Sequence, residues 1–402
     1  MSMTPLVCWI VVNSVPYHEA RARAVAAAGD LRICMVQLTE VDTFRVLQRP
    51  RESDVICRHT LFPDTPFSEI RGRKMARRIW ERLDEIKPAI VCINGWSFGG
   101  SIAALGWGLS RRIPVVVMSD STEIDEDRHW WLEAVKRRIL ALCSAALVAG
   151  TPHSGYLQVL GTGAERIFKG YDAVDNEHFA RGAAAARRRE RQLRSALGLP
   201  SRYFLACARF SRKKNLLALL DAFASYRQLH EVDAWSLVIV GDGELRSELL
   251  AARDRLGLAD HVLLTGARPY DELPAYYGLA GAFVHASTTE QWGLVVNEAM
   301  ASGLPVLVSN RCGCAVDLVE EGRNGFLFDP YNKFSLAIAL HRVATSGSAL
   351  DEMGRISRRI IARWSPENFA RNLSRAADTA LSIAPPRPTI FDRLLLGLLS
   401  TR

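Results

Sequence analysis

Two glutamates in the second half of the sequence have a spacing that suits the binding of a polyol. Glu290 and Glu298 lie in EQWGLVVNEAMASGLP, which otherwise has the apolar character of a buried helix. Glu290 follows the predicted strand GAFVHAS, and Glu298 falls about one turn into the predicted helix 294–302. Carboxylates accept hydrogen bonds strongly and therefore bind vicinal hydroxyls well. The alternative is a solvated Glu298 and a Glu290 that serves only as a turn residue.

An anion site is predicted beside these acids. Gly293 permits an unusual backbone conformation, and the helix that begins near Leu294 offers unpaired N–H groups and a positive dipole end. Such a helix start suits a diphosphate. Arg209 and Lys214 follow the predicted strand YFLACARF at the start of another helix, where cations are unfavourable unless an anion lies between them. We expect these cations to clamp a diphosphate and to stabilise the charge that develops as it leaves.

The elements that position these residues alternate between strand and helix in two series. Continuous apolar strands of this kind indicate parallel sheets covered on both faces. The chain has 402 residues, which also favours two domains. Ligands of such sheets bind outside the carboxyl ends of the strands, and two facing domains form a cleft. The predicted strands are LVCWIVV, LRICMVQL, DVICR, AIVCIN, PVVVMS and AALVAG, then YFLACARF, SLVIVGDGE, HVLLTGA, GAFVHAS, LPVLVS and GFLFDP.

Charge and cysteine content exclude little. The net charge of +8 leaves phosphorylated small molecules, anionic lipid surfaces and nucleic acid open as partners, or a basic surface without a specific partner. The run RRRER is expected to be a solvated helix face or linker, because no aromatic residues are interleaved for base stacking. Most of the eight cysteines lie in apolar runs, which is typical of reduced core thiols in the cytoplasm. Cys312 and Cys314 form a C-x-C without a second pair nearby, so no zinc site is predicted there.

No membrane-spanning segment or signal peptide is predicted. Residues 89–110 are uncharged and long enough to span a bilayer, but they divide into a strand, a glycine-rich turn and a helix. The first residues, MSMTPLVCWIVVNS, lack a basic region and a cleavage site. We expect a cytoplasmic protein, with peripheral contact at the inner face of the membrane as an alternative.

An ordered set of motifs across residues 200–345 resembles the family-4 retaining glycosyltransferases of the GT-B fold. Besides Arg209 and Lys214, the set comprises GDGE, TGARP, E-x7-E, WGL, EAMASGLPVL and EEGRNGFLFDP. The resemblance implies two Rossmann-like, doubly wound parallel-sheet domains facing a central cleft, with the last helix crossing back to the first domain. The expected boundaries are an acceptor-binding domain 1–182, a linker 183–199, a nucleotide-sugar domain 200–365 and a returning tail 366–402.

The resemblance also implies residue roles in the second domain. Arg209 and Lys214 bind the donor diphosphate, Glu290 contacts the donor sugar near Gly293 and Leu294, and Glu298 holds the ribose. Trp292 replaces the more usual Phe as a wall of the site, and Asn215 replaces a common Gly after the lysine. The nucleobase, most often uracil in such enzymes, meets the backbone near Ala267 and Arg268, and Gly241 belongs to the donor-site turn GDGE.

The first domain departs from the family pattern. Many relatives have a Gly-Gly loop after the first strand, where this chain has NSVPYHEAR. His18 and Arg21 are therefore candidate cleft residues, or His18 is a solvated residue at a helix start. Asp120 aligns with a His of many relatives and either accepts a hydrogen bond from the acceptor hydroxyl or caps the next segment. His153 either faces the cleft or caps a helix.

The implied reaction is retaining glycosyl transfer from a nucleotide-diphosphate sugar, most often a UDP-sugar, to an unknown hydroxyl acceptor such as a cell-envelope glycan, glycolipid or lipopolysaccharide precursor. GT-B enzymes generally use cations and a helix end in place of a metal. We therefore expect no metal or cofactor, and we interpret EIDED at 123–127 as a solvated loop or helix start. The alternatives are a sugar-nucleotide epimerase of the same fold and a non-catalytic binder of nucleic acid or anionic surfaces. The final IFDRLLLGLL, with Arg393 and Arg402, either packs on the first domain or docks residues 390–402 on a membrane.

Overall fold

The computed structural model describes residues 4–41, 56–229 and 234–401. Asp54 and Val55 of the predicted strand DVICR, and Arg402, lie outside these ranges. The chain divides into two compact units. Unit 1 comprises residues 1–174 and 365–402, and unit 2 comprises residues 175–364.

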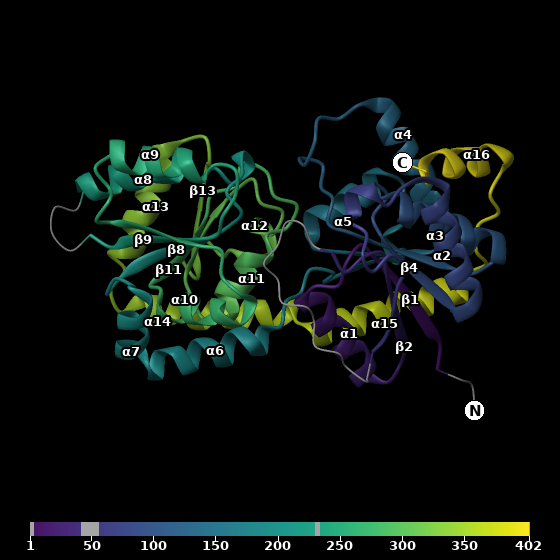
Figure 1. The fold of residues 1–402 in the computed structure, drawn as a ribbon, viewed down its shortest axis with the longest axis horizontal. Coiled ribbons are helices and arrows are strands. Elements are labelled where there is room, and N and C mark those ends of the chain that lie inside the picture. Colours follow the sequence, from purple (N-terminus) through teal and green to yellow (C-terminus); the bar gives the residue numbers. More distant parts are fainter. Residues whose placement is uncertain (1–3, 42–55, 230–233, 402) are drawn as a thin grey trace. The chain divides into compact units, whose positions relative to one another are not determined.

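Unit 1 contains a parallel sheet, part of which is labelled in Figure 1. Its strand order among the described residues is β3-β2-β1-β4-β5-β6-β7. Its strands are β1 (Leu6–Val11), β2 (Arg32–Gln37), β3 (Cys57–Thr60), β4 (Ile90–Asn94), β5 (Val115–Ser119), β6 (Ala145–Val148) and β7 (Ile167–Lys169). Its helices are α1 (Pro16–Ala28), η1 (Phe67–Glu69), α2 (Gly72–Ile86), α3 (Gly99–Arg111), α4 (Trp130–Ala141), α5 (Thr151–Val159), η2 (Ala164–Arg166), α15 (Pro366–Ser382) and α16 (Ile390–Leu399).

Both faces of this sheet are buried, which explains its continuous apolar strands. In β1, Cys8 and Ile10 face the core formed with α2 and α3, whereas Val7 and Trp9 face the core formed with α1 and α15. α15 returns from unit 2 and packs along α1, where Phe369 stacks on Trp9 with ring centroids 5.7 Å apart. The predicted return of the last helix is confirmed.

Unit 2 contains a second parallel sheet, ordered β10-β9-β8-β11-β12-β13 among the described residues. Figure 1 shows α8, α9 and α13 over one face and α10, α11 and α14 over the other. Its strands are β8 (Tyr203–Cys207), β9 (Ser236–Val240), β10 (Val262–Gly266), β11 (Ala282–His285), β12 (Val306–Ser309) and β13 (Gly325–Phe328). Its helices are α6 (Asn176–Arg188), α7 (Glu190–Leu197), η3 (Arg212–Lys214), α8 (Leu216–Leu229), α9 (Arg246–Arg255), η4 (Tyr270–Glu272), α10 (Leu273–Leu279), α11 (Leu294–Ala301), α12 (Ala315–Leu318), α13 (Lys333–Ala344), α14 (Ala349–Ile361) and η5 (Ala362–Trp364).

The segment 183–199 is helical and belongs to unit 2. It comprises the end of α6 and all of α7, and α6 packs closely against α10. A Cβ added to Gly278 would lie 2.7 Å from the Cα of Ala183, so glycine allows the two helices to approach. Arg187, the first residue of RRRER, donates from Nη2 to the carbonyl oxygen of Ser302 at 2.7 Å.

Residues 89–110 form β4, a turn and most of α3, as predicted. Across the parts of the chain that the structure describes, no helix has the length and apolar character needed to cross a membrane.

Candidate functional site

The predicted charged residues Arg209, Lys214 and Glu290 follow the carboxyl ends of two central strands of unit 2. β8 and β11 are neighbours, and the chain leaves β8 toward β9 on its other side, so the strand order reverses between them. This topological switch point is where doubly wound sheets bind ligands. Arg209 follows β8 and is exposed, Lys214 ends η3, and Glu290 lies in the loop after β11.

Lys214 and Glu290 form an ion pair between Nζ and Oε2, and both side chains are largely buried. The hydroxyl of Ser287 donates to the same carboxylate oxygen at 3.2 Å, and Nε2 of His285 lies 3.4 Å from it. Burial alone would raise the pKa of Glu290, but hydrogen bonding and charge from His285 and Lys214 hold it well below its usual range. Glu290 is therefore a preorganised carboxylate that can accept hydrogen bonds from hydroxyl groups.

Gly293 turns the chain into α11 beside this ion pair. Its φ of +107° is in the left-handed region, and it occupies the N-cap position before Leu294. An added Cβ would meet Glu290 and His285 at 3.5 Å, an ordinary contact, so glycine is needed for the backbone conformation rather than for space. The arrangement places the positive end of α11 next to the Lys214–Glu290 pair.

Glu298 lies in the same helix and is 6% exposed. Its Oε2 accepts a hydrogen bond of 2.7 Å from the hydroxyl of Tyr277 on α10. Burial raises the pKa of Glu298 to about 7, and the Tyr277 hydrogen bond opposes this rise only in part. The carboxyl group is thus poised to change protonation near neutral pH.

Trp292 is 2% exposed and supports the site from within the unit. Its ring stacks on Trp364, and its Nε1 donates to Oδ1 of Asn297 at 2.8 Å. This bond gives the fully buried side-chain oxygen of Asn297 a hydrogen-bond donor within α11. The wall role of Trp292 stays a prediction.

The C-x-C motif is joined to the Glu290 loop by backbone hydrogen bonds. Cys312 forms a β-bridge with Glu290, and the N–H of Gly313 donates to the Glu290 carbonyl oxygen at 2.9 Å. The N–H of Cys314 donates to the carbonyl oxygen of Trp292 at 3.2 Å. Both thiols are buried, so this motif has a structural role in the unit.

Two neighbouring turns carry the remaining predicted donor residues. Gly241, with φ +142°, follows β9 and donates from its N–H to Gly266 at 3.0 Å, and an added Cβ would lie 1.9 Å from the Ala208 carbonyl oxygen. Ala267 is exposed beyond β10, while Nη2 of Arg268 donates back to the Thr265 carbonyl oxygen at 2.9 Å. These contacts place the two turns beside each other and the Gly241 turn beside the loop that follows β8.

The backbone conformation at Asn215 explains how Asn can replace the common Gly after Lys214. Its φ is +57°, in the left-handed region that Asn tolerates better than most residues. Its Nδ2 donates to the carbonyl oxygen of Pro330 at 2.9 Å. Asn at this position therefore permits the left-handed backbone and adds a side-chain hydrogen bond to the loop that contains Pro330.

In unit 1, Arg21 and Asp120 belong to one polar cluster. Arg21 is 1% exposed, donates from Nε to Ala173 at 2.8 Å and pairs with Asp172 at 3.2 Å. Burial and the neighbouring charge of Asp172 raise the pKa of Asp120 to about 7. Sequence reasoning missed Asp172, which follows the three-residue strand β7 that was not predicted.

The two histidines cap helices. Nδ1 of His153 accepts from the Gly150 N–H at 3.2 Å, and the side chain is fully buried. Nδ1 of His18 lies 3.4 Å from the Val15 N–H at the start of α1, and its ring packs on Trp9. For His153 this geometry matches the capping alternative. His18 is partly buried at the start of α1, whereas its alternative was a solvated side chain, and the cleft roles of both histidines stay predictions.

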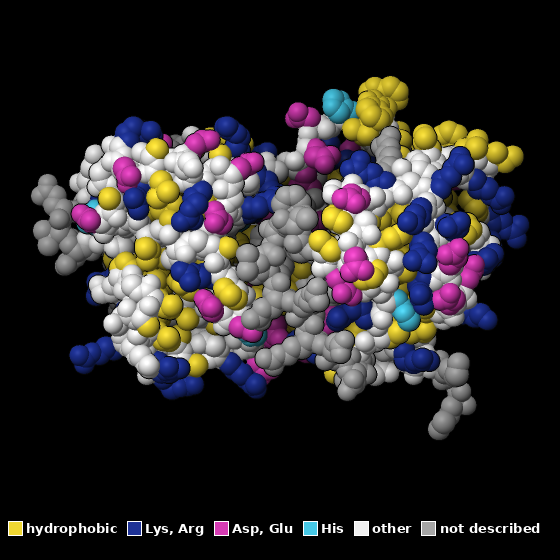
Figure 2. Space-filling view, in the orientation of Figure 1, with side chains coloured by type: hydrophobic (Ala, Val, Ile, Leu, Met, Phe, Trp, Pro, Cys, Tyr) yellow, Lys and Arg dark blue, Asp and Glu magenta, His cyan; other side chains and the backbone are white. Residues whose placement is uncertain are grey.

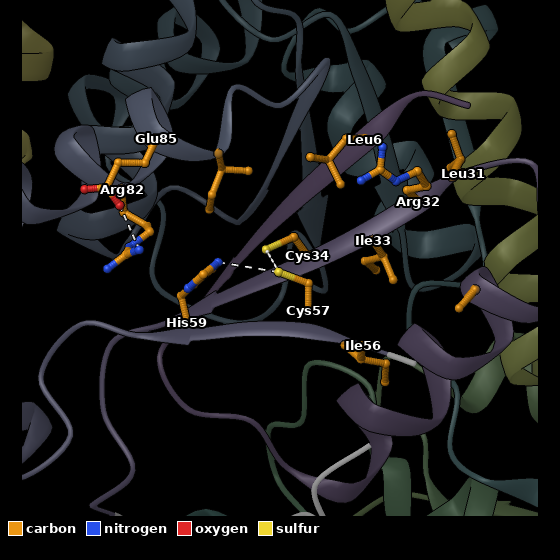
Figure 3. A pocket seen from close by; sticks show the side chains of 12 residues that line it. Leu6, Leu31, Arg32, Ile33, Cys34, Ile56, Cys57, His59, Arg82 and Glu85 are labelled. Carbon is orange, nitrogen blue, oxygen red and sulfur yellow. Dashed lines mark hydrogen bonds and ion pairs between the residues drawn. The ribbon is translucent and has the colours of Figure 1, made fainter. Parts of the chain in front are cut away.

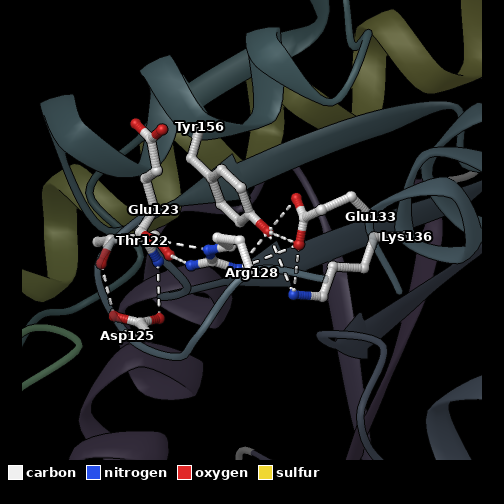
Figure 4. A network of polar contacts seen from close by, with 7 residues as sticks. All are labelled: Thr122, Glu123, Asp125, Arg128, Glu133, Lys136 and Tyr156. Carbon is white, nitrogen blue, oxygen red and sulfur yellow. Dashed lines mark hydrogen bonds and ion pairs between the residues drawn. The ribbon is translucent and has the colours of Figure 1, made fainter. Parts of the chain in front are cut away.

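The acidic run 123–127 is a loop fixed by a polar network (Figure 4). Asp125 accepts from the Thr122 N–H at 2.7 Å, and Nη1 of Arg128 donates to the Tyr156 hydroxyl at 2.7 Å and to Glu133 at 3.2 Å. The network joins the loop after β5 to α4 and α5, and so fixes the segment that follows Asp120.

Comparisons with known proteins agree with this geometry. Residues 189–360 match the model of the glycosyl transferases group 1 family, which covers the sheet and the site of unit 2. The alpha-monoglucosyldiacylglycerol synthase of Streptococcus pneumoniae is 39% identical over 119 residues, covering 29% of this chain and 26% of that protein. The GDP-mannose-dependent alpha-(1-6)-phosphatidylinositol monomannoside mannosyltransferase of Mycobacterium tuberculosis is 31% identical over 210 residues, covering 50% of this chain and 53% of that protein. The matches thus span about half or less of these curated relatives.

Solved structures resemble more than nine tenths of the chain in fold. A sucrose-phosphate synthase from Thermosynechococcus elongatus has a TM-score of 0.72 at 20% identity and covers 92% of this chain and 97% of that one. Anabaena HepE in complex with UDP has a TM-score of 0.69 at 17% identity and covers 94% and 100%. The two parallel sheets and these neighbours establish the GT-B fold. The family match confirms the resemblance to GT-B glycosyltransferases, whereas membership of family 4 stays a prediction.

Proposed function

We propose that this protein is a retaining, metal-independent glycosyltransferase that moves a sugar from a nucleoside diphosphate sugar to a hydroxyl acceptor. The observation that carries the proposal is the Lys214–Glu290 ion pair beside the N-terminus of α11, with Glu298 one turn further along. A cation, a helix end and two carboxylates at a switch point match the phosphates and hydroxyls of such a donor.

Each group has a proposed task. Lys214 and Arg209 bind the diphosphate and stabilise its charge as it leaves, Glu290 holds the sugar, and Glu298 holds the ribose. The acceptor attacks the donor sugar on the face from which the phosphate leaves, and the leaving phosphate takes the acceptor proton. Asp120 accepts a hydrogen bond from the acceptor hydroxyl. Catalysis then consists of positioning and charge stabilisation.

A thermal-shift series tests the donor. We expect UDP and UDP-sugars to raise the melting temperature, because a ligand that binds only the native state stabilises it. UDP is proposed first because HepE was solved with UDP and with UDP-glucose, but a curated relative is GDP-mannose-dependent, so GDP is the matched comparison. No shift with any nucleoside diphosphate would contradict the proposal. Incubation with the donor alone must leave its C2 configuration unchanged, which separates transfer from epimerisation.

For the acceptor, we propose a lipid-linked hydroxyl presented at an anionic membrane surface. The two curated relatives are named for lipid products or substrates. In unit 1, six large apolar side chains on α4 and α16 are 50–85% exposed, and Figure 2 shows the hydrophobic gathering along that edge. They are Trp130, Trp131, Ile390, Phe391, Leu394 and Leu398.

Contacts on the opposite side of α16 hold this helix with its four apolar side chains of this set exposed. Leu396 is buried in the core beneath it, and the fully buried Asp392 pairs with Arg138 of α4 through a hydrogen bond of 2.6 Å from Nη2. Arg393 and Arg387 are exposed beside the apolar residues and match an anionic surface. Both alternatives for this segment are thus combined in the proposal, with one side packed and the other free to dock.

Vesicle co-sedimentation tests the docking. We expect binding to vesicles that contain an anionic lipid, weaker binding to neutral vesicles, and loss of binding in a Phe391→Ser, Leu394→Ser double variant. A Phe334→Ser, Ile338→Ser double variant removes similarly exposed side chains from α13 of unit 2 and should bind normally. Equal binding by both variants would contradict the proposed surface.

A further inference from the structure

Three cysteines from distant parts of unit 1 lie side by side across its sheet. The parallel register pairs Cys8 of β1 with Cys34 of β2, and Cys34 with Cys57 of β3. His59 follows Cys57 by two residues and therefore projects from the same face of β3. From the sequence, these thiols are expected to be separate core residues, because the register between strands cannot be read from a sequence.

The donor atoms of three of these residues converge (Figure 3). The Sγ atoms of Cys34 and Cys57 are 2.9 Å apart, and Nε2 of His59 is 3.5 Å from the Cys57 Sγ. All three atoms lie within 4.8 Å of one another, and this is the one such group of Cys, His, Asp and Glu in the described residues.

The cluster opens into a cavity of about 760 Å³. Its lining includes Leu6 and Arg32, the first residues of β1 and β2, and Arg82 and Glu85 of α2. Glu85 pairs with Arg82 at 2.8 Å and so offsets its positive charge near the thiols. Because the cavity lies toward the amino ends of the strands, it is separate from the carboxyl edge where Asp120 lies.

We propose that Cys34 Sγ, Cys57 Sγ and His59 Nε2 bind a thiophilic divalent cation of the Zn²⁺ class, with a fourth position open to the cavity. Thiolate and imidazole are the donors that Zn²⁺ prefers, and three protein ligands leave a tetrahedral site with one exchangeable position. Two sulfurs on one Zn²⁺ at about 2.3 Å lie roughly 3.8 Å apart, so the pair needs to open by only about 1 Å. Binding releases the two thiol protons to solvent, and the two thiolates neutralise the ion.

Cobalt binding to the reduced full-length chain tests this site. We expect one Co²⁺ per chain, with the near-ultraviolet thiolate-to-cobalt absorption, displacement by Zn²⁺ and release of protons. Cys34→Ala and Cys57→Ala should abolish the absorption, and His59→Ala should weaken binding by at least about tenfold. The matched control is Cys92→Ala, which removes a fully buried thiol that faces the other core of the same sheet.

The outcomes separate clearly. An unchanged circular dichroism spectrum and an unchanged melting profile, both measured without cation or nucleotide, show that unit 1 of the cysteine variants remains folded. Absence of the thiolate absorption from the reduced wild type overturns the assignment, even if air oxidation then joins Cys34 to Cys57. Equal absorption in Cys57→Ala and Cys92→Ala also overturns it.

Discussion

Lys214 and Glu290 are 76 residues apart in the sequence, yet their side chains form an ion pair at the junction of β8 and β11. The contact joins the two loops that flank the switch point of the sheet. The N–H of Thr288 also donates to the Lys213 carbonyl oxygen at 2.9 Å, so backbone and side chain both fix the loops together.

Replacement of Lys214 should therefore impair catalysis more than folding. We expect Lys214→Ala to lower kcat by about 10²–10³, as for loss of one group that stabilises transition-state charge. Lys213→Ala removes an exposed neighbouring charge and should leave kcat near the wild-type value. The measurement is the steady-state kcat of both variants with the donor identified by thermal shift. Near-normal turnover of Lys214→Ala would refute the proposed role of Lys214.

Glu298 should make donor binding depend on pH. Ribose hydroxyls donate to the ionised carboxylate, so binding favours deprotonation of a group whose pKa burial has raised to about 7. Affinity should then rise as pH increases toward 7 and level off above it, with proton release below that point. Calorimetric titration at several pH values measures this dependence.

The Glu298→Gln variant is the control for the nucleotide's own phosphate titration. It keeps the shape of the side chain but cannot ionise, so its affinity should be lower and should show only the phosphate contribution. Superimposable pH profiles for the variant and the wild type would show that Glu298 does not bind the ribose.

Asn215 should tolerate glycine better than alanine. At φ +57°, Ala pays about 1–2 kcal/mol for the left-handed backbone, whereas Gly loses only the hydrogen bond to Pro330. Denaturant unfolding should thus rank the wild type and Asn215→Gly above Asn215→Ala. The reverse order of the two variants would contradict the backbone explanation.

Gly241 and Gly257 form a matched pair for steric effects. Both have positive φ, but an added Cβ meets the Ala208 carbonyl oxygen at 1.9 Å at Gly241 and nothing within 4 Å at Gly257. Gly241→Ala should lower the unfolding midpoint more than Gly257→Ala and should also weaken nucleotide binding, because the carbonyl precedes Arg209. Equal losses in stability would show that only the φ strain matters.

The strands and the switch-point residues could be predicted because their signals are local. Uninterrupted apolar runs such as AIVCIN mark strands buried on both faces, and a residue just after such a run must lie at the carboxyl edge. β7 escaped prediction because only three residues, Ile167–Lys169, pair at the sheet edge and none is fully buried.

The partners of the site residues could not be predicted in the same way. Tyr277 reaches Glu298 from α10, and Asp172 reaches Arg21 across 151 residues. The Cys34–Cys57 contact depends on the register of two strands whose connection carries no periodic signal. Such pairs depend on tertiary packing, which no pattern within one segment of the chain specifies.

The return of α15 determines when each unit can fold during synthesis. Unit 2 is continuous in the sequence and can complete its core once residue 364 has left the ribosome. Unit 1 begins first but must wait for the synthesis of α15, because Phe369 and its neighbours on that helix cover Trp9 and one face of the sheet. Translation that stops early therefore leaves a finished second unit attached to an open first one, whose apolar surface is exposed to aggregation.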